Sequence, residues 1–260
     1  MKNNWKKFSP FLGSVLIFLL HIPFVFAKPA GRIADDINKH TNYKKIVTAT
    51  GNPGDIIADN LTPLNKQNVF DSLKLNMLGL SKNIFELAVK GLEKLKESGI
   101  ILSDNIISIA DFSQPSSSKR LYIIDLNNYS LLFQTYVAHG QKSGREYAEK
   151  FSNRPRSFQS SPGFYVTLSP YTGVNGYSLK LNGLESGINN NALTRDIVIH
   201  GADYVNEALV QEQGYIGRSQ GCPAVPKQLN RSIIETIKNG TCLFIYPGQS
   251  SYLQKSAILK

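Results

Sequence analysis

The sequence predicts an α+β fold, in which a mainly-β domain of the sandwich or barrel-like kind follows a small helical segment. Two observations carry this prediction. From residue 106 onward, short apolar runs alternate with turns rich in glycine, asparagine and serine, a pattern typical of antiparallel β domains. Before that point, between residues 80 and 95, apolar side chains recur every three or four positions, the spacing of one helix face.

The first 64 residues are predicted to lie outside this domain. Residues 1–27 combine a lysine-containing start with an apolar stretch and a small final residue, which is typical of a cleaved secretory signal peptide. An uncleaved membrane anchor is the alternative, but the stretch is short for a span and contains His21 and Pro23. Residues 28–64 are polar and are predicted to form a flexible spacer. We therefore expect an exported protein of the periplasm or cell envelope, without stable membrane insertion after signal cleavage.

Residues 65–104 are predicted to form a helical segment that packs on the following domain. Ser81 or Asn83 can cap the start of its main helix, and Gly99 can end it. The charged side chains between residues 86 and 97 then fall on the solvent side. The apolar face comprises Leu80, Ile84, Leu87, Ala88, Leu92 and Leu95.

Residues 105–250 are predicted to form the mainly-β domain, and residues 251–260 a C-terminal tail. The polar residues 140–161 carry five lysines and arginines and are predicted to be a surface loop or lid. A helix is expected from Pro226 to Lys238, because proline favours a helix start and Gly240 can follow the end. Strands are expected at residues 106–109, 121–125, 131–137, 164–168, 179–181, 197–199 and 243–246.

The charge of the chain favours an anionic partner. Its 260 residues have a formal net charge of +10, and removal of the three lysines in residues 1–27 leaves +7. Such an excess suits nucleic acid, anionic lipid or an acidic cell-wall polymer. The sequence contains no lysine and arginine block of five or more, so we expect no nucleic-acid partner. The oligomeric state stays open.

One stretch carries the residues of a nucleophilic site. The apolar run at residues 197–199 leads into His200 and Gly201, and Cys222 follows the histidine by 22 positions. A cysteine attacks carbonyl groups as its thiolate, so it needs a base or a positive neighbour. A histidine at a strand end, brought onto a cysteine in a glycine-containing turn, supplies that base. The stretch predicts a Cys222–His200 pair.

Several motifs around this pair resemble the murein L,D-transpeptidase catalytic domain family, the YkuD-like cysteine enzymes of peptidoglycan. The resemblance covers roughly residues 111–247 and implies a YkuD-like catalytic domain. It is carried by Val137-Ala138-His139-Gly140, Ser160-Ser161-Pro162-Gly163-Phe164-Tyr165, Gly176-Tyr177-Ser178-Leu179, His200-Gly201 and Arg218-Ser219-Gln220-Gly221-Cys222-Pro223-Ala224-Val225-Pro226.

The resemblance implies a role for each residue of the motif. Cys222 would be the nucleophile and His200 the base, with a backbone carbonyl orienting the histidine. Ser219 would hold the loop or contact substrate, and Gly221 would shape an oxyanion hole from backbone amides. Arg218 would bind a substrate carboxylate, although an ordinary surface charge is the alternative. The remaining candidates for substrate contact are His139, Tyr177, Ser178 and Gly201.

The implied activity is peptidoglycan L,D-transpeptidation through a thioester on the cysteine, without a cofactor or metal, and with peptidoglycan stem peptides as partners. Transfer to water would make the protein an L,D-carboxypeptidase, and loss of turnover would leave an inactive peptidoglycan-binding module. A structural disulfide between Cys222 and Cys242 is a weaker alternative, because the motif implies that Cys222 is a free nucleophile. A zinc site using both cysteines with His139 and His200 is also weaker, because no paired metal-ligand spacing is present.

The sequence also departs from the broad family. An aliphatic residue and an arginine commonly follow the cysteine, whereas Pro223-Ala224-Val225-Pro226 follow it here. Gln220 stands where histidine or arginine is frequent. The nucleophile is unaffected, but any substrate contact from that arginine must come from another part of the chain.

Overall fold

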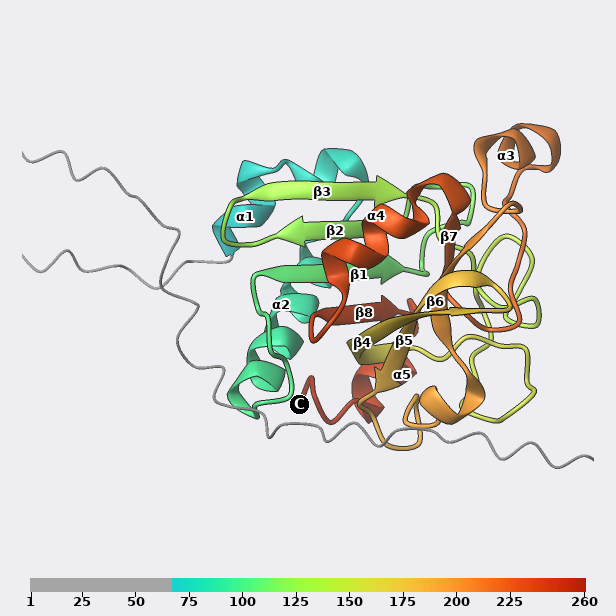
Figure 1. Ribbon diagram of the computed structural model, residues 1–260. Coiled ribbons are helices and arrows are strands. Elements are labelled where there is room, and N and C mark those ends of the chain that lie inside the picture. Colours follow the sequence, from blue (N-terminus) through green and yellow to red (C-terminus); the bar gives the residue numbers. More distant parts are fainter. Residues whose placement is uncertain (1–66) are drawn as a thin grey trace, which may run out of the picture. The chain divides into compact units, whose positions relative to one another are not determined.

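The computed structural model describes residues 67–260 (Figure 1). The predicted signal peptide and spacer, residues 1–27 and 28–64, lie outside these described residues. The helices are α1 (Gln67–Ser72), α2 (Lys82–Glu97), α3 (Glu207–Gln213), α4 (Lys227–Ile237) and α5 (Ser250–Lys255), with short 3-10 turns η1 (Leu75–Leu78) and η2 (Leu193–Arg195). The strands are β1 (Ile106–Asp111), β2 (Leu121–Asp125), β3 (Ser130–Thr135), β4 (Gly163–Gly173), β5 (Gly176–Gly183), β6 (Val198–Ala202), β7 (Ala224–Pro226) and β8 (Cys242–Tyr246).

These strands form one sheet in the order β3-β2-β1-β8-β4-β5-β6-β7. The pairs β1–β8 and β6–β7 are parallel, and the other neighbours are antiparallel. Beyond β3 the chain continues to Ala138, which forms a bridge with Ala224 of β7 at the opposite edge. The sheet is therefore nearly closed, and the predicted mainly-β, barrel-like α+β fold is confirmed.

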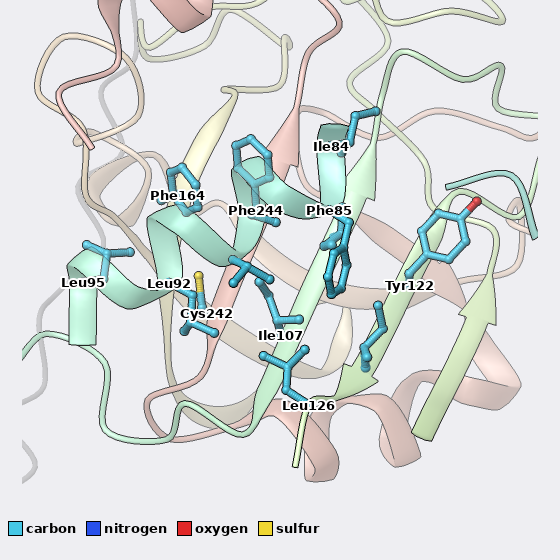
Figure 2. Close-up of a cluster of buried hydrophobic side chains, with 14 of the residues drawn as sticks. Ile84, Phe85, Leu92, Leu95, Ile107, Tyr122, Leu126, Phe164, Cys242 and Phe244 are labelled. Carbon is cyan, nitrogen blue, oxygen red and sulfur yellow. The ribbon is translucent and has the colours of Figure 1, made fainter. Parts of the chain in front are cut away.

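The two faces of the sheet bury different side chains, because successive residues of a strand point to opposite sides. On β1, Ile107 and Ile109 pack toward α2, whereas Ala110 packs with the side chains of α4. Figure 2 shows the cluster on the α2 side, where Phe164 and Phe244 stack at 4.2 Å between ring centroids. Figure 1 shows α4 in front of the sheet and α2 behind it.

The helix α2 begins and ends as its sequence predicts. The Ser81 side chain accepts a hydrogen bond from the Ile84 amide, which caps the first turn. After the helix, Gly99 adopts a φ of 71°, a left-handed conformation that glycine favours. The predicted apolar face is buried against β1 and β8, apart from the half-buried Leu87. None of the helices within residues 67–260 is long and apolar enough to cross a bilayer.

Other elements differ from the sequence-based expectation. Strand β4 runs to Gly173 rather than ending near Leu168, because a bulge between Thr167 and Pro170 accommodates the proline. Helix α3 and strand β7 were not expected. Residues 251–260, expected to be a tail, include most of α5 and bury Tyr252, together with two further apolar side chains, against the α2 side of the sheet.

Candidate active site

A cleft of about 590 Å³ brings the predicted nucleophile and base together. Cys222 and His200 both line it. Strand register explains their proximity, since His200 on β6 pairs with Ala224 on β7, two residues after the cysteine. Ser219 and Arg218 also line the cleft. Residues 140–161, here called the 140–161 loop, form part of its wall.

The imidazole of His200 is held by a backbone carbonyl. Its Nδ1 lies 3.1 Å from the Gly201 oxygen, and a carbonyl can only accept a hydrogen bond, so Nδ1 carries the proton. The other nitrogen, Nε2, is then the acceptor and is able to take a proton. Burial lowers the pKa of His200, and the Gly201 carbonyl offsets part of this effect. His200 is therefore neutral at neutral pH.

The thiol of Cys222 is nearly buried and lies 3.6 Å from the Asp196 carbonyl oxygen, to which it donates. Burial raises the pKa of Cys222, while the Val198 backbone and the positive charge of Arg195 lower it. Burial is the largest of these effects, so the thiol is protonated at neutral pH. The resting site therefore contains a neutral thiol and a neutral imidazole rather than an ion pair.

The turn that carries the cysteine, residues 218–223, is held by the hydroxyl of Ser219. This hydroxyl accepts from the Gly221 amide at 3.0 Å and donates to the Cys222 carbonyl at 2.6 Å. The Gly221 amide is therefore engaged within the turn. Gly221 has a φ of 127°, and a side chain there would approach the Gln159 carbonyl oxygen to 2.9 Å. The turn therefore requires glycine at this position.

The 140–161 loop packs directly on this turn. The Gln141 amide donates to the Ser219 carbonyl at 2.7 Å, and the Ser219 amide donates to the His139 carbonyl at 2.9 Å. Buried Ser160 accepts from the Gly140 amide at 3.0 Å and donates to the Gly221 carbonyl at 3.1 Å. The cysteine turn is thus fixed on both sides, by its own serine and by the loop.

His139 lies behind the cleft rather than in its lining. Its side chain is fully buried, with Nδ1 2.8 Å from Arg120 Nη2 and Nε2 3.3 Å from the Gly144 carbonyl. Burial and the charge of Arg120 lower its pKa to about 3, so Nδ1 accepts and Nε2 donates. Its side chain is therefore placed to hold the chain between β3 and the cysteine turn, not to touch a ligand.

Tyr177, Ser178 and Gly201 surround the site without lining the cleft. The Tyr177 hydroxyl donates to Glu235 on α4. Ser178 is buried and pairs with His200 across β5 and β6. A Cβ at Gly201 would lie 2.9 Å from the Cβ of Asn230, so this glycine permits close packing of β6 on α4. These three residues therefore support the position of β6, the strand that carries His200, through its neighbours β5 and α4.

The cleft also contains residues that sequence reasoning missed, namely Arg156, Arg195, Asp196 and Tyr204. Of the two arginines, Arg195 is the one whose charge lowers the pKa of Cys222. It is the last residue of η2 and lies shortly before β6, so its place before the apolar run at residues 197–199 was the only available signal. Arg156 was counted only as one charge of a surface loop.

The two cysteines lie in different environments. Cys242 is fully buried among the α2-facing side chains of the sheet, where Figure 2 shows its sulfur, whereas Cys222 lines the cleft. Both are free thiols. Within residues 67–260, no group of three or more histidine, cysteine or acidic side chains is arranged to hold a metal ion. The disulfide and the zinc site considered above are therefore not formed here.

Comparison with known proteins identifies the family. The sequence model of a protein family described as the L,D-transpeptidase catalytic domain matches residues 76–246 of this chain. None of the curated proteins compared with the chain matches it. Similar solved structures include an L,D-transpeptidase from Mycobacterium smegmatis, with 12% identity, 54% of this chain and 58% of that chain covered and a TM-score of 0.34. Another is the helical cell shape determining protein Pgp2 from Campylobacter jejuni, with 12% identity and a TM-score of 0.37. The match covers 60% of this chain and 53% of the Pgp2 chain. The match thus spans less than two thirds of either of these chains.

The family match covers more than half of the 260 residues and includes α2, all eight strands and the cleft. The chain belongs to the L,D-transpeptidase catalytic domain family.

Proposed function

We propose that this protein is a peptidoglycan L,D-transpeptidase that uses Cys222 as nucleophile and His200 as general base. The observation that carries the proposal is the placement of both side chains in one cleft, with the Nδ1 proton of the histidine held by the Gly201 carbonyl. This arrangement leaves Nε2 as the base, as nucleophilic catalysis by a neutral thiol requires.

In the first half-reaction, Sγ attacks the carbonyl carbon of an L,D-peptide bond while His200 Nε2 takes the thiol proton. We assign the hydrogen bond to the resulting oxyanion to the Cys222 amide, since the Gly221 amide already donates to Ser219. The carbon–nitrogen bond then breaks, His200 gives its proton to the leaving amine, and a thioester remains on Cys222. The thiol must first turn away from the Asp196 carbonyl.

In the second half-reaction, an amine of another stem peptide attacks the thioester. His200 accepts a proton from this amine as the new peptide bond forms. The carbon–sulfur bond then breaks, and His200 returns the proton to Sγ, which re-forms the thiol. Members of the family act on peptidoglycan in the cell envelope, so the donor we propose is a tetrapeptide stem that loses its terminal D-alanine. Export through the predicted signal peptide would place the protein with this substrate.

A second candidate is L,D-carboxypeptidase activity, in which water replaces the amine as acceptor. The wide cleft, about 590 Å³ in volume, favours neither acceptor over the other by size alone. An inactive peptidoglycan-binding module is the remaining alternative, and the intact pair of Cys222 and His200 argues against it.

The test is incubation of the purified protein with tetrapeptide muropeptides, with products identified by mass spectrometry. Cross-linked dimers that lack the terminal D-alanine, and that are absent with Cys222→Ala, would support transpeptidation. Free D-alanine with tripeptide monomers would move the assignment to carboxypeptidase. If the wild-type protein forms no product beyond those formed by Cys222→Ala, both enzymatic assignments are contradicted.

A further inference from the structure

The cleft carries an excess of positive charge. Three guanidinium groups, those of Arg156, Arg195 and Arg218, line it together with one carboxylate, that of Asp196. A concave site with a net positive lining attracts an anionic ligand. The three arginines differ, however, in how many of their donors the protein itself already uses.

Arg195 uses its donors within the 140–161 loop. Its Nη1 donates to the Ser152 carbonyl at 2.7 Å, and its Nη2 donates to Ser157 Oγ at 3.1 Å and to the Gln159 carbonyl at 2.8 Å. The guanidinium therefore supplies charge to the cleft but holds the loop with its hydrogen bonds. It is a positioning residue rather than a ligand for substrate.

Arg218 is partly engaged. Its Nη1 donates to the Gly144 carbonyl at 3.3 Å, and its guanidinium carbon lies 5.8 Å from the centre of the Tyr215 ring. Arg156 differs from both. Its side chain is exposed in the cleft and has no hydrogen bond or ion pair with any residue of the described part of the chain.

The backbone around Arg156 is unusual as well. Arg156 and Phe158 both have a φ of 56°, in the left-handed region that residues other than glycine seldom adopt. The bonds of Arg195 to Ser157 and Gln159, and a 3.0 Å bond from the Lys142 amide to the Phe158 carbonyl, hold this conformation. Strained residues that the surrounding structure fixes in place occur at ligand-binding sites.

We propose that Arg156 binds a carboxylate of the acyl-donor peptide. This inference rests on the proposed function. The free fork of donors on Arg156 matches a carboxylate in a bidentate pair. The fixed loop holds this side chain in the cleft that Cys222 also lines, so binding costs little further ordering. The strained backbone thus aims a substrate-binding side chain.

The test separates binding from turnover by using the Cys222→Ala protein. Calorimetry measures the affinity of this protein for the tetrapeptide and for two amidated forms, one blocked at the terminal D-alanine and one at the internal carboxylates. The measurement is repeated with Arg156→Ala, Arg156→Lys and Arg154→Ala. Arg154 is the matched control, because it is an exposed arginine of the same loop that does not line the cleft.

Loss of the charge-assisted bond in Arg156→Ala is expected to weaken tetrapeptide binding on the order of 10- to 100-fold. Arg156→Lys should recover part of the affinity, and Arg154→Ala should leave it unchanged. One of the two amidated peptides should bind the Cys222→Ala protein as weakly as it binds the same protein with Arg156→Ala added. The carboxylate that is blocked in this peptide is then the one that Arg156 binds. An Arg156→Ala affinity equal to that of Arg154→Ala for all three peptides would overturn the proposal.

The outcome is independent of the activity assay. If the wild-type protein forms no Cys222-dependent product but the Arg156 variants bind the free peptide more weakly, the carboxylate site stands and the enzymatic assignment falls. If products form but binding does not depend on Arg156, the enzymatic assignment stands and the carboxylate site falls.

Discussion

The protonation states of Cys222 and His200 determine how the site can work. Burial shifts the pKa of both groups toward the neutral form, upward for the thiol and downward for the imidazole. In the proposed mechanism, the thiolate of Cys222 is therefore generated as His200 removes the thiol proton, rather than being present beforehand. This distinguishes the site from cysteine sites in which a positive neighbour holds a preformed thiolate.

We predict a specific pH dependence for this pair. Alkylation of Cys222 by iodoacetamide should accelerate with pH around a midpoint above 9, because burial raises the thiol pKa. The acidic limb of kcat/KM should have its midpoint below 6.5, since His200 must be neutral to act as base. Cys222→Ala is the control for labelling of Cys242. An alkylation midpoint near pH 7 or lower would mean a preformed thiolate.

The Ser219 hydroxyl is predicted to support activity through the shape of the cysteine turn. Ser219→Ala removes the contacts with the Gly221 amide and the Cys222 carbonyl. The substitution releases the Gly221 amide and lets the Cys222 amide move. We expect kcat/KM to fall by about 10- to 100-fold, which is the size of the loss when an oxyanion donor is misplaced. Ser232→Ala, an exposed serine of α4, is the comparison. An activity equal to that of Ser232→Ala would show that the turn holds its shape without the hydroxyl.

Sequence reasoning predicted Cys222, His200 and Arg218 in this cleft but missed Arg156 and Arg195. The pair was predictable because strand β6 and the turn before β7 carry a recognisable spacing of residues. Arg195 and Arg156 are brought to Cys222 by packing between segments that lie far apart in the sequence. No spacing rule marks such a contact, and a charge on a polar loop is most often a solvated one. The role of His139 was hidden for the same reason, since Arg120 meets it only in the fold.

At the scale of elements, α2 depends on a glycine at its contact with the sheet. A Cβ at Gly91 would lie 2.1 Å from the ring of Phe164, which itself stacks on Phe244. Gly91→Ala should therefore lower the free energy of unfolding by about 1–3 kcal/mol through overpacking, despite the better helix propensity of alanine. Urea denaturation measures the change, with Glu86→Ala on the exposed face as control. An increase in stability would show that α2 sits less tightly on the sheet.

Helix α5 is tied to the core by the buried carboxylate of Glu185. This carboxylate accepts from the Phe164 amide and the Tyr252 hydroxyl, each at 2.8 Å, and from the Ser256 hydroxyl. Glu185→Gln should lower the free energy of unfolding by about 1–3 kcal/mol, because the amide group replaces one acceptor with a donor. Exposed Glu212→Gln is the control. Equal denaturation midpoints for the two variants would contradict this role.

The elements that periodicity predicts were those with a clear apolar pattern. Helix α2 buries helically spaced side chains, and strands β1, β2 and β8 are short apolar runs buried on both faces, so their residues carry the signal. Helix α3 buries none of its side chains, and its signals are only a capping Asn206 and the left-handed Gly214. Pro170 hid the second half of β4, since a proline in a strand is tolerated only at an edge or a bulge.

At the scale of the whole molecule, the buried pair of Arg120 and His139 links the start of the sheet to the cysteine turn. Arg120 donates to the Val137 carbonyl from Nε and Nη2 and to the Gln114 carbonyl from Nη1. Burial lowers the pKa of Arg120 to about 9 and that of His139 to about 3. The fold therefore depends on a neutral His139.

This pair predicts a loss of stability in acid. The pKa of His139 is about 3 in the folded protein and near 6.5 when unfolded, so the unfolded chain binds the extra proton between these values. The contribution is fully present above pH 6.5 and is lost as the pH falls toward 3. His139→Asn keeps an acceptor for Arg120 but does not titrate. Between pH 7.5 and 4.5, the wild-type protein should lose on the order of 2 kcal/mol more than His139→Asn in urea denaturation. Equal losses would exclude a neutral buried His139 as the cause.

The central claim is that Cys222 forms a covalent acyl intermediate with His200 as its base. Intact-protein mass spectrometry after mixing with a tetrapeptide donor, without an amine acceptor, tests it directly. We predict a mass increase equal to the tripeptide acyl group, located on Cys222 by peptide mapping, strongly reduced in His200→Ala and absent in Cys222→Ala. An adduct on another residue, or the same adduct yield without His200, would contradict the account.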